Sequence, residues 1–286
     1  MTKANENLIV ALGPRRYSVE RPFGDLPTRS GIVTDVAVDS RAHIFALLRR
    51  DPLNNPAAPG VVELLPDGSR LSEWGEEISD AHMLIAGKNG KIYVVDRDAH
   101  EVIIFDSQGH RIGGLGQRHS PGTPFHHPTD LALLPDGKIA VSDGYGNALV
   151  HVFSDTGELI RSFGGIGVSP GEFITPHAIW PVGANAVVIA DRENHRLQVF
   201  SLDGKLLDVW SGFFRPQAIW GDGAGHLYVT DSVPSLTALT EAGKRLGRCR
   251  PVLNGAHGIS GDAQSGIIYL AEGNPSRLTR LVPLTV

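Results

Sequence analysis

The sequence predicts an all-β fold, a six-bladed β-propeller that forms a single domain over residues 1–286. Two consecutive copies of one unit, residues 130–165 and 177–212, carry the same succession of short apolar runs and turns. Each copy contains four runs of strand length, and apolar and polar residues alternate in them as in strands. Repetition at a period of roughly 40 to 50 residues, with four strands per unit, is typical of propeller blades.

Six units are present, and we take the chain in order by strand position. The first strands open at Asp35, His82, Asp130, His177, Gln217 and His257. The second strands are HIFALL near Ile44 and the runs that end at Asp96, Asp143, Asp191, Asp231 and Glu272. The third strands include VVELL, EVIIFD, LVHVFS, RLQVFS, LTALT and RLTRLV. The fourth strands are LSEWG, RIGGLG, LIRSFGG, LLDVWSG and, with a weaker pattern, KRLGRC.

The sixth unit reaches the end of the sequence without a fourth strand. Residues 17–24, YSVERPFG, resemble the other fourth strands and precede the first unit. We therefore expect this N-terminal strand to complete the last blade, which closes the ring and removes an open sheet edge.

Composition excludes several function classes. The formal net charge is −5 and both signs are interspersed, so no basic face for nucleic acid is expected. No apolar run is long enough to span a bilayer, and residues 1–17 lack the apolar core of a secretory signal. The only cysteine, Cys249, excludes an internal disulfide and a cysteine-rich zinc cluster. We expect a cytoplasmic protein with neither nucleic acid nor membrane as a partner.

The residues that open the first strands should form a ring around the central channel, because first strands line the axis of a propeller. Histidine stands in every second blade, at His82, His177 and His257, although the chain has only 12 histidines. Three neutral imidazoles on one axis make an open zinc site with one position left for water or substrate. The alternative is that they only form hydrogen bonds within a polar channel.

The other three opening residues, Asp35, Asp130 and Gln217, are candidates to orient the imidazoles or bind channel water. The alternative, which the sequence supports equally, is that their side chains bind backbone amides at the strand ends. Asp143 with Asn147, and Asp191 with Asn194, recur at the same turn of neighbouring blades. This repetition favours a structural role, in which the side chains bind backbone amides of the turn.

The segment from Phe125 to Phe200 carries a more specific resemblance. HHPTDLAL, VSDGYGN, PGEF, PHAI and ADREN follow one another there. With its six units, the chain resembles NHL-repeat propellers and, within them, the peptidyl-α-hydroxyglycine α-amidating lyases, which are zinc enzymes. The resemblance implies zinc binding by His82, His177 and His257. It also implies catalytic roles for Tyr145, in the Asp-Gly-Tyr turn, and for Arg49, with Arg50 as a rival.

Three positions depart from the family. Gly258 follows the third histidine where the family has an acidic residue that helps to bind calcium, so we do not expect that calcium site. Gly255 replaces a methionine of the pocket wall, and Gly146 replaces a cysteine in the tyrosine turn. We expect no monooxygenase partner domain, and therefore a small α-hydroxy compound as substrate instead of a peptide hormone.

The leading hypothesis is a zinc-dependent lyase that cleaves the C–N bond of a small α-hydroxy amide into an amide and a carbonyl product such as glyoxylate. Tyr145 would be the base, and Arg49 would bind a substrate carboxylate. One alternative is a zinc hydrolase of a lactone, ester or amide, with the ring aspartates as bases. The other is an NHL propeller that binds a partner without catalysis. The insertion at residues 49–60, rich in proline, is expected to lie over one face. Oligomeric state and metals other than zinc stay open.

Overall fold

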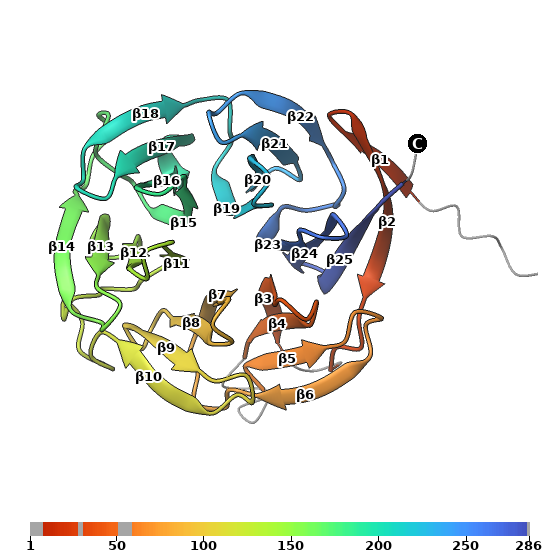
Figure 1. Ribbon diagram of the computed structural model, residues 1–286, viewed down its shortest axis with the longest axis horizontal. Coiled ribbons are helices and arrows are strands. Elements are labelled where there is room, and N and C mark those ends of the chain that lie inside the picture. The colour runs from red at the N-terminus through yellow and green to blue at the C-terminus, as the bar shows by residue number, and fades with distance from the viewer. Residues whose placement is uncertain (1–7, 28–30, 51–58, 285–286) are drawn as a thin grey trace, which may run out of the picture.

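The computed structural model describes residues 8–27, 31–50 and 59–284. Its sheets are arranged as six blades around a central axis (Figure 1), as the sequence predicts. The innermost strands are β3 (Ile32–Val38), β7 (Ala81–Ala86), β11 (Asp130–Leu133), β15 (Pro176–Val182), β19 (Pro216–Gly221) and β23 (Ala256–Asp262). Each contacts the next, and β23 contacts β3, so the innermost strands form a closed ring.

The remaining strands lie progressively farther from the axis. The second strands are β4 (Ile44–Arg49), β8 (Ile92–Asp96), β12 (Ile139–Asp143), β16 (Ala186–Asp191), β20 (His226–Asp231) and β24 (Ile267–Gly273). The third strands are β5 (Val61–Leu64), β9 (Glu101–Phe105), β13 (Leu149–Phe153), β17 (Arg196–Ser201), β21 (Leu236–Thr240) and β25 (Ser276–Pro283). The outer strands are β6 (Arg70–Trp74), β10 (Arg111–Leu115), β14 (Leu159–Gly164), β18 (Leu206–Trp210), β22 (Arg245–Cys249) and β2 (Arg15–Phe23).

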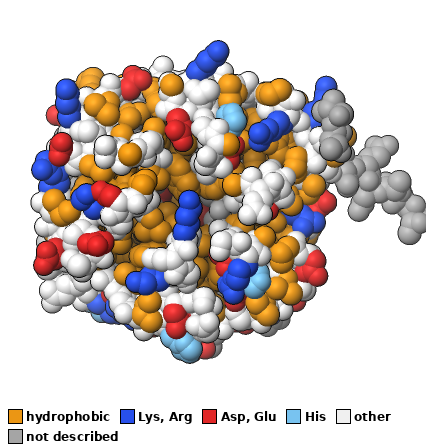
Figure 2. Space-filling view, in the orientation of Figure 1, with side chains coloured by type: hydrophobic (Ala, Val, Ile, Leu, Met, Phe, Trp, Pro, Cys, Tyr) orange, Lys and Arg blue, Asp and Glu red, His pale blue; other side chains and the backbone are white. Residues whose placement is uncertain are grey.

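The burial of the strands follows their distance from the axis. The second strand β12 is buried at every position, because it packs between neighbouring blades on both faces. The outer strand β14, in contrast, is exposed at five of its six positions. Apolar side chains from adjacent blades therefore fill the space between the sheets. Acidic and basic side chains are interspersed over the face seen along the axis (Figure 2).

The last blade is completed from the N-terminal side of the chain. The strand β2 pairs antiparallel with β25, with Val19 opposite Leu281, and so supplies the fourth strand predicted from the sequence. A fifth strand that was not predicted, β1 (Leu8–Leu12), pairs with β2 and contacts β22 of the fifth blade. Its residues Val10 and Leu12 are buried. The N-terminal hairpin thus joins the fifth and sixth blades.

Helix is almost absent from the described residues. The one helical segment is a single 3₁₀ turn, η1 (Arg192–Asn194), at the end of β16. None of the described residues forms a helix with the length and apolar character required to cross a bilayer. Most of the insertion predicted at residues 49–60, namely residues 51–58, lies outside the described residues.

Deletion of residues 1–24 should lower the melting temperature of the whole domain in a single transition, because β2 closes the sixth blade and β1 contacts the fifth. A synthetic peptide of residues 8–24 added in trans should raise the melting temperature again, whereas a peptide of the same composition in scrambled order should not. Calorimetry measures both effects. A truncated protein that melts at the temperature of the full chain would contradict this closure.

Candidate metal centre

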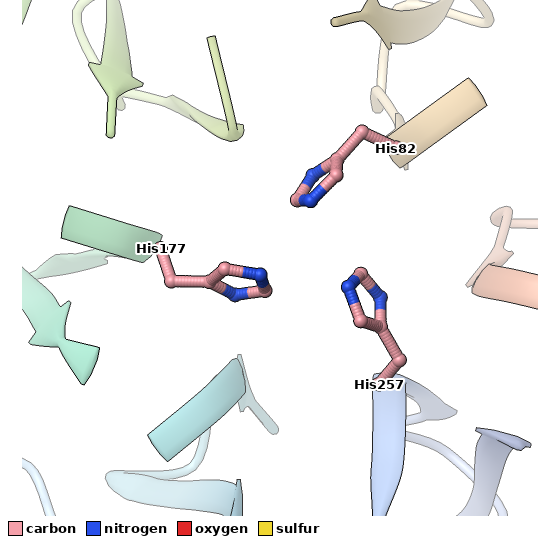
Figure 3. A group of neighbouring side chains, drawn as sticks. All are labelled: His82, His177 and His257. Atoms are coloured by element: carbon pink, nitrogen blue, oxygen red, sulfur yellow. The ribbon is translucent and has the colours of Figure 1, made fainter. Parts of the chain in front are cut away.

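The three predicted histidines converge on the propeller axis. Each is the second residue of its strand: His82 in β7, His177 in β15 and His257 in β23 (Figure 3). Each pair of ring centroids is 5.0 Å apart. One nitrogen atom from each ring lies within 4.8 Å of the other two, close enough to hold a metal ion. Among the described residues, no other group of three histidine, cysteine or acidic side chains meets that criterion.

A β-bulge aims each imidazole into the channel. The register of β15 with β16 shifts between Pro176 and Ala178, and the shift falls at His177. The register of β23 with β24 shifts in the same way at His257, and the register of β7 with β8 shifts between Ala81 and Leu84, across His82 and Met83. A bulge turns the strand locally and redirects one side chain, which explains why these residues face the axis from inside a strand.

Backbone carbonyls from the neighbouring blades fix the orientation of the imidazoles. Nδ1 of His82 lies 2.5 Å from the carbonyl oxygen of Thr129. Nδ1 of His177 lies 2.6 Å from that of Gln217, and Nδ1 of His257 lies 2.8 Å from that of Thr34. Since a carbonyl oxygen only accepts, each Nδ1 carries the proton and donates. The Nε2 lone pairs therefore remain available to a shared cation.

The electrostatic environment keeps the three imidazoles neutral. Burial lowers the pKa of His82 and of His177 well below the usual value, and lowers that of His257 to about 4. The positive charge of Arg49 lowers the pKa of all three further. Neutral imidazoles with inward lone pairs are the donor set that zinc accepts, so the residues present fit such an ion.

Tyr145 lies at the mouth of this site. Its hydroxyl is 3.1 Å from Nε2 of His82 and 3.1 Å from Nε2 of His177. The turn that carries Tyr145 is tightly packed, because a side chain at Gly144 would collide with the Pro176 carbonyl. A side chain at Gly146 would collide with His126, which explains glycine at this departure from the family.

Of the two candidate arginines, Arg49 faces the metal centre. Its Nε lies 2.6 Å from Oδ1 of Asp80 and donates to the carbonyl of Ala81, the residue before His82. Its Nη2 is buried and has no hydrogen-bond partner among the described residues. Arg50 instead donates to the carbonyl of Ile78.

The ring aspartates have a backbone role. Oδ2 of Asp35 accepts from the amide of Leu84 at 2.9 Å, and Oδ2 of Asp130 accepts from the amide of Ile179 at 3.0 Å. Each amide belongs to a neighbouring blade and lies two residues after a histidine. Neither carboxylate forms a hydrogen bond to an imidazole, and both bind backbone amides, as the second interpretation from sequence expects. Burial raises the pKa of Asp130 to about 7 and that of Asp35 well above its usual value.

The Gln217 side chain also does not orient an imidazole. Its Nε2 donates to the hydroxyl of Ser232, while its backbone carbonyl holds His177. At Gly258, an added side chain would collide with the carboxylate of Asp35. The space that a side chain would need there is thus filled by an aspartate from the first blade.

The structure adds residues that the sequence interpretation missed. Nη1 of Arg192 donates to the Tyr145 hydroxyl at 3.1 Å. The guanidinium of Arg97 lies 5.4 Å from the centroid of the Tyr145 ring, and Nη2 of Arg97 lies 2.5 Å from Oδ2 of Asp80. Both arginines directly follow the terminal aspartate of a second strand, at Asp96-Arg97 and Asp191-Arg192. The repeated Asp-Arg dipeptide was the sequence pattern from which Arg97 and Arg192 could have been predicted as site residues.

Comparison with known proteins bears out the fold. Residues 129–210 match a protein-family model described as a 6-bladed beta-propeller. Human NHL repeat-containing protein 3 is 25% identical over 285 residues, which cover 89% of this chain and 80% of that protein. The chain is a six-bladed β-propeller that is similar to NHL-repeat proteins. A solved streptogramin B lyase structure matches with a TM-score of 0.68 at 13% identity, covering 96% of this chain and 100% of that chain, which shows the fold alone.

A closer likeness covers less of the chain. A Caenorhabditis elegans protein described as a probable peptidyl-alpha-hydroxyglycine alpha-amidating lyase is 35% identical over 127 residues. The match covers 42% of this chain and 36% of the worm protein, so this propeller spans only about a third of that relative. The resemblance to amidating lyases is therefore present over part of the length.

Metal analysis should find about one divalent transition-metal ion per chain in protein purified without chelator. Alanine at His82, His177 or His257 should lower the stoichiometry at least several-fold, because each change removes one of three donors. His110→Ala is the matched control, since His110 is exposed on the hairpin between β9 and β10. Retention of metal by all three variants would contradict the site.

The pKa of His257 also predicts a pH dependence for the metal-free protein. Because its pKa falls from 6.5 to about 4 on folding, the unfolded chain binds more protons between these values. Stability therefore falls as pH decreases through this window, by up to about 3 kcal/mol. His257→Asn lacks this contribution, so the difference in unfolding free energy between wild type and variant should shrink from pH 6.5 to pH 4 in denaturant titrations. A constant difference would contradict a lowered pKa of His257 in the folded protein.

Proposed function

We propose that the protein is a metal-dependent lyase that cleaves the C–N bond of a small α-hydroxy amide, giving an amide and a carbonyl product such as glyoxylate. One observation carries this proposal. A tyrosine hydroxyl meets two converging imidazole Nε2 atoms and a guanidinium at 3.1 Å. The tyrosine as proton acceptor, the imidazoles as a candidate cation site and the positively charged guanidinium therefore lie together, where the hydroxyl group of a substrate could react.

His82, His177 and His257 would hold the metal, with zinc as the preferred ion. When bound, the ion would act as a Lewis acid that makes a neighbouring hydroxyl more acidic. The rest of the chemistry belongs to this chain's side chains. The carbonyl-bound Nδ1 atoms fix the rings.

Tyr145, as tyrosinate, would remove the proton from the substrate hydroxyl. The electron pair of the O–H bond forms the new C=O bond, while the C–N electron pair leaves on nitrogen. The phenol so formed can return the proton to that nitrogen, which balances the reaction without an oxidant or a water molecule. Arg192 supports the anionic phenolate through its hydrogen bond to the hydroxyl oxygen.

Arg49 would hold the carboxylate of the substrate. Its Nε is fixed by Asp80, which leaves the buried Nη2 as a donor without a partner among the described residues. An unsatisfied buried donor costs about 1–3 kcal/mol, and a substrate carboxylate would recover this energy. A planar guanidinium also suits a carboxylate geometrically.

The hydrolase alternative has less support. It needs a base to activate water, and Asp35 and Asp130 are instead bonded to backbone amides of neighbouring blades. The similarity to a probable amidating lyase over 42% of the chain favours elimination as well. We therefore propose a small-molecule lyase as the single function.

Incubation with α-hydroxyhippurate should release glyoxylate and benzamide. Tyr145→Phe should lower kcat by roughly 10²- to 10⁴-fold because it removes the proton acceptor. Arg49→Gln should raise KM by roughly tenfold or more through the lost charge-assisted hydrogen bonds. Glyoxylate is measured by a coupled spectrophotometric assay, with the exposed Arg161→Gln variant as the control.

Reaction in ¹⁸O-labelled water separates elimination from hydrolysis. Elimination incorporates no solvent oxygen into the amide, whereas hydrolysis would place it in an acid product. Mass spectrometry of the isolated products reads this directly. The diagnostic acid is benzoate, because the aldehyde oxygen of glyoxylate exchanges with water in either case. ¹⁸O-labelled benzoate in place of benzamide, or wild-type activity in Tyr145→Phe, would overturn the lyase proposal.

A further inference from the structure

The rim around Tyr145 carries more guanidinium groups than one substrate carboxylate requires. Arg49 ends β4 of the first blade, Arg97 follows β8 of the second and Arg192 follows β16 of the fourth. In the third blade, the corresponding turn carries Tyr145. Four consecutive blades thus present Arg49, Arg97, Tyr145 and Arg192 at the same end of their second strands.

Arg97 is held rigidly but keeps free donors. Its Nε donates to Oδ1 of Asp98 at 3.0 Å, and its Nη2 lies 2.5 Å from Oδ2 of Asp80. Asp80 binds Arg49 through its other oxygen, so one carboxylate spans both guanidinium groups. Nη1 of Arg97 makes no hydrogen bond to any described residue. Arg97 is therefore oriented for an additional acceptor beside the one that Arg49 would bind.

The charges on this rim do not cancel. Among the described residues, the side chains joined by these ion pairs are the guanidinium groups of Arg49, Arg97, Arg192 and Arg215, the carboxylates of Asp80, Asp98 and Glu193, and the imidazole of His127 beside Asp98. Four positive charges face three negative ones. Neutral imidazoles would leave the charge of a bound divalent ion uncompensated as well. Such a site favours a ligand with more than one negative charge.

We propose that Arg97 forms a second anion subsite and that the preferred substrate is a dicarboxylate, an α-hydroxy amide with a second carboxylate on its acyl group. This inference rests on the proposed function for the identity of the reacting centre. Arg49 takes the carboxylate next to the hydroxyl-bearing carbon. Arg97 takes the second carboxylate through Nη1 and determines specificity.

Two substrates of equal shape test the subsite. N-Succinyl-α-hydroxyglycine carries the second carboxylate, and N-(4-methylpentanoyl)-α-hydroxyglycine replaces it with a branched alkyl group of similar size. The wild type should prefer the succinyl compound by roughly 10- to 100-fold in kcat/KM, the value of a charge-assisted hydrogen bond. Arg97→Gln should reduce this preference to nearly one.

Two further variants separate subsite recognition from general effects. Arg49→Gln should lower kcat/KM for both substrates and keep their ratio, because both share the first carboxylate. Arg161→Gln, on the outer strand β14 with its side chain 45% exposed, should change neither value. An unchanged ratio in Arg97→Gln, or a wild-type preference for the uncharged isostere, would overturn the subsite.

If neither compound is turned over, the lyase proposal is refuted. The anion subsite can then still be tested by calorimetric measurement of ligand binding. Glutarate should bind the wild type roughly tenfold more tightly than butyrate, and Arg97→Gln should lose this difference. Equal affinity of wild type and Arg97→Gln for glutarate would refute the dicarboxylate subsite independently of catalysis. Melting curves of each variant confirm that the protein remains folded.

Discussion

The arrangement of residues around the three histidines depends on a buried carboxylate at the end of each of three second strands. Asp96, Asp143 and Asp191 are completely buried. Each accepts from a backbone amide in the loop that leads into the first strand of its own blade, for example His126 to Asp143 at 2.8 Å and Ile174 to Asp191 at 2.8 Å. A buried carboxylate without partners is costly, so these bonds fix the loop and the strand end together. The next residues of the chain are Arg97, Gly144-Tyr145 and Arg192, whose positions follow from this constraint.

A second constraint on the site is that imidazoles and the carbonyl groups that bind them come from alternate blades. The second, fourth and sixth blades supply imidazoles, and the first, third and fifth supply the carbonyl oxygens of Thr34, Thr129 and Gln217 that hold them. The first and third blades also supply the carboxylates of Asp35 and Asp130, which accept hydrogen bonds from backbone amides of the second and fourth blades, where His82 and His177 lie. The first, third and fifth blades therefore each orient an imidazole of a neighbouring blade. An isolated blade would not hold a histidine in this orientation, which couples site geometry to closure of the ring.

Repetition explains which parts of the structure could be predicted from sequence. The strands and the histidines recur at a fixed period, so alignment of the units places them without knowledge of contacts. A structural role for Asp143 and Asn147 was predictable for the same reason, but their partners differ from the turn amides expected. Nδ2 of Asn147 donates to Asp143 at 2.7 Å, and Asp143 accepts from the amide of His126, in the loop before β11. Pairs such as Asp80 with Arg49 and Arg97 join three segments in two blades, and no local pattern marks them. The strand β1 was missed because it lies outside the repeat.

The same fold gives the imidazoles and the guanidinium groups opposite environments. The histidines point inward from bulges in the innermost strands, where burial lowers their pKa and keeps them neutral. The arginines stand at the ends of the second strands, where partial exposure and carboxylate partners keep them charged. A metal requires unprotonated donors, while an anionic ligand requires permanent positive charge. The Tyr145 hydroxyl contacts both sets, at 3.1 Å from Nε2 of His82 and of His177 and from Nη1 of Arg192, so this residue joins the neutral and the charged parts of the site.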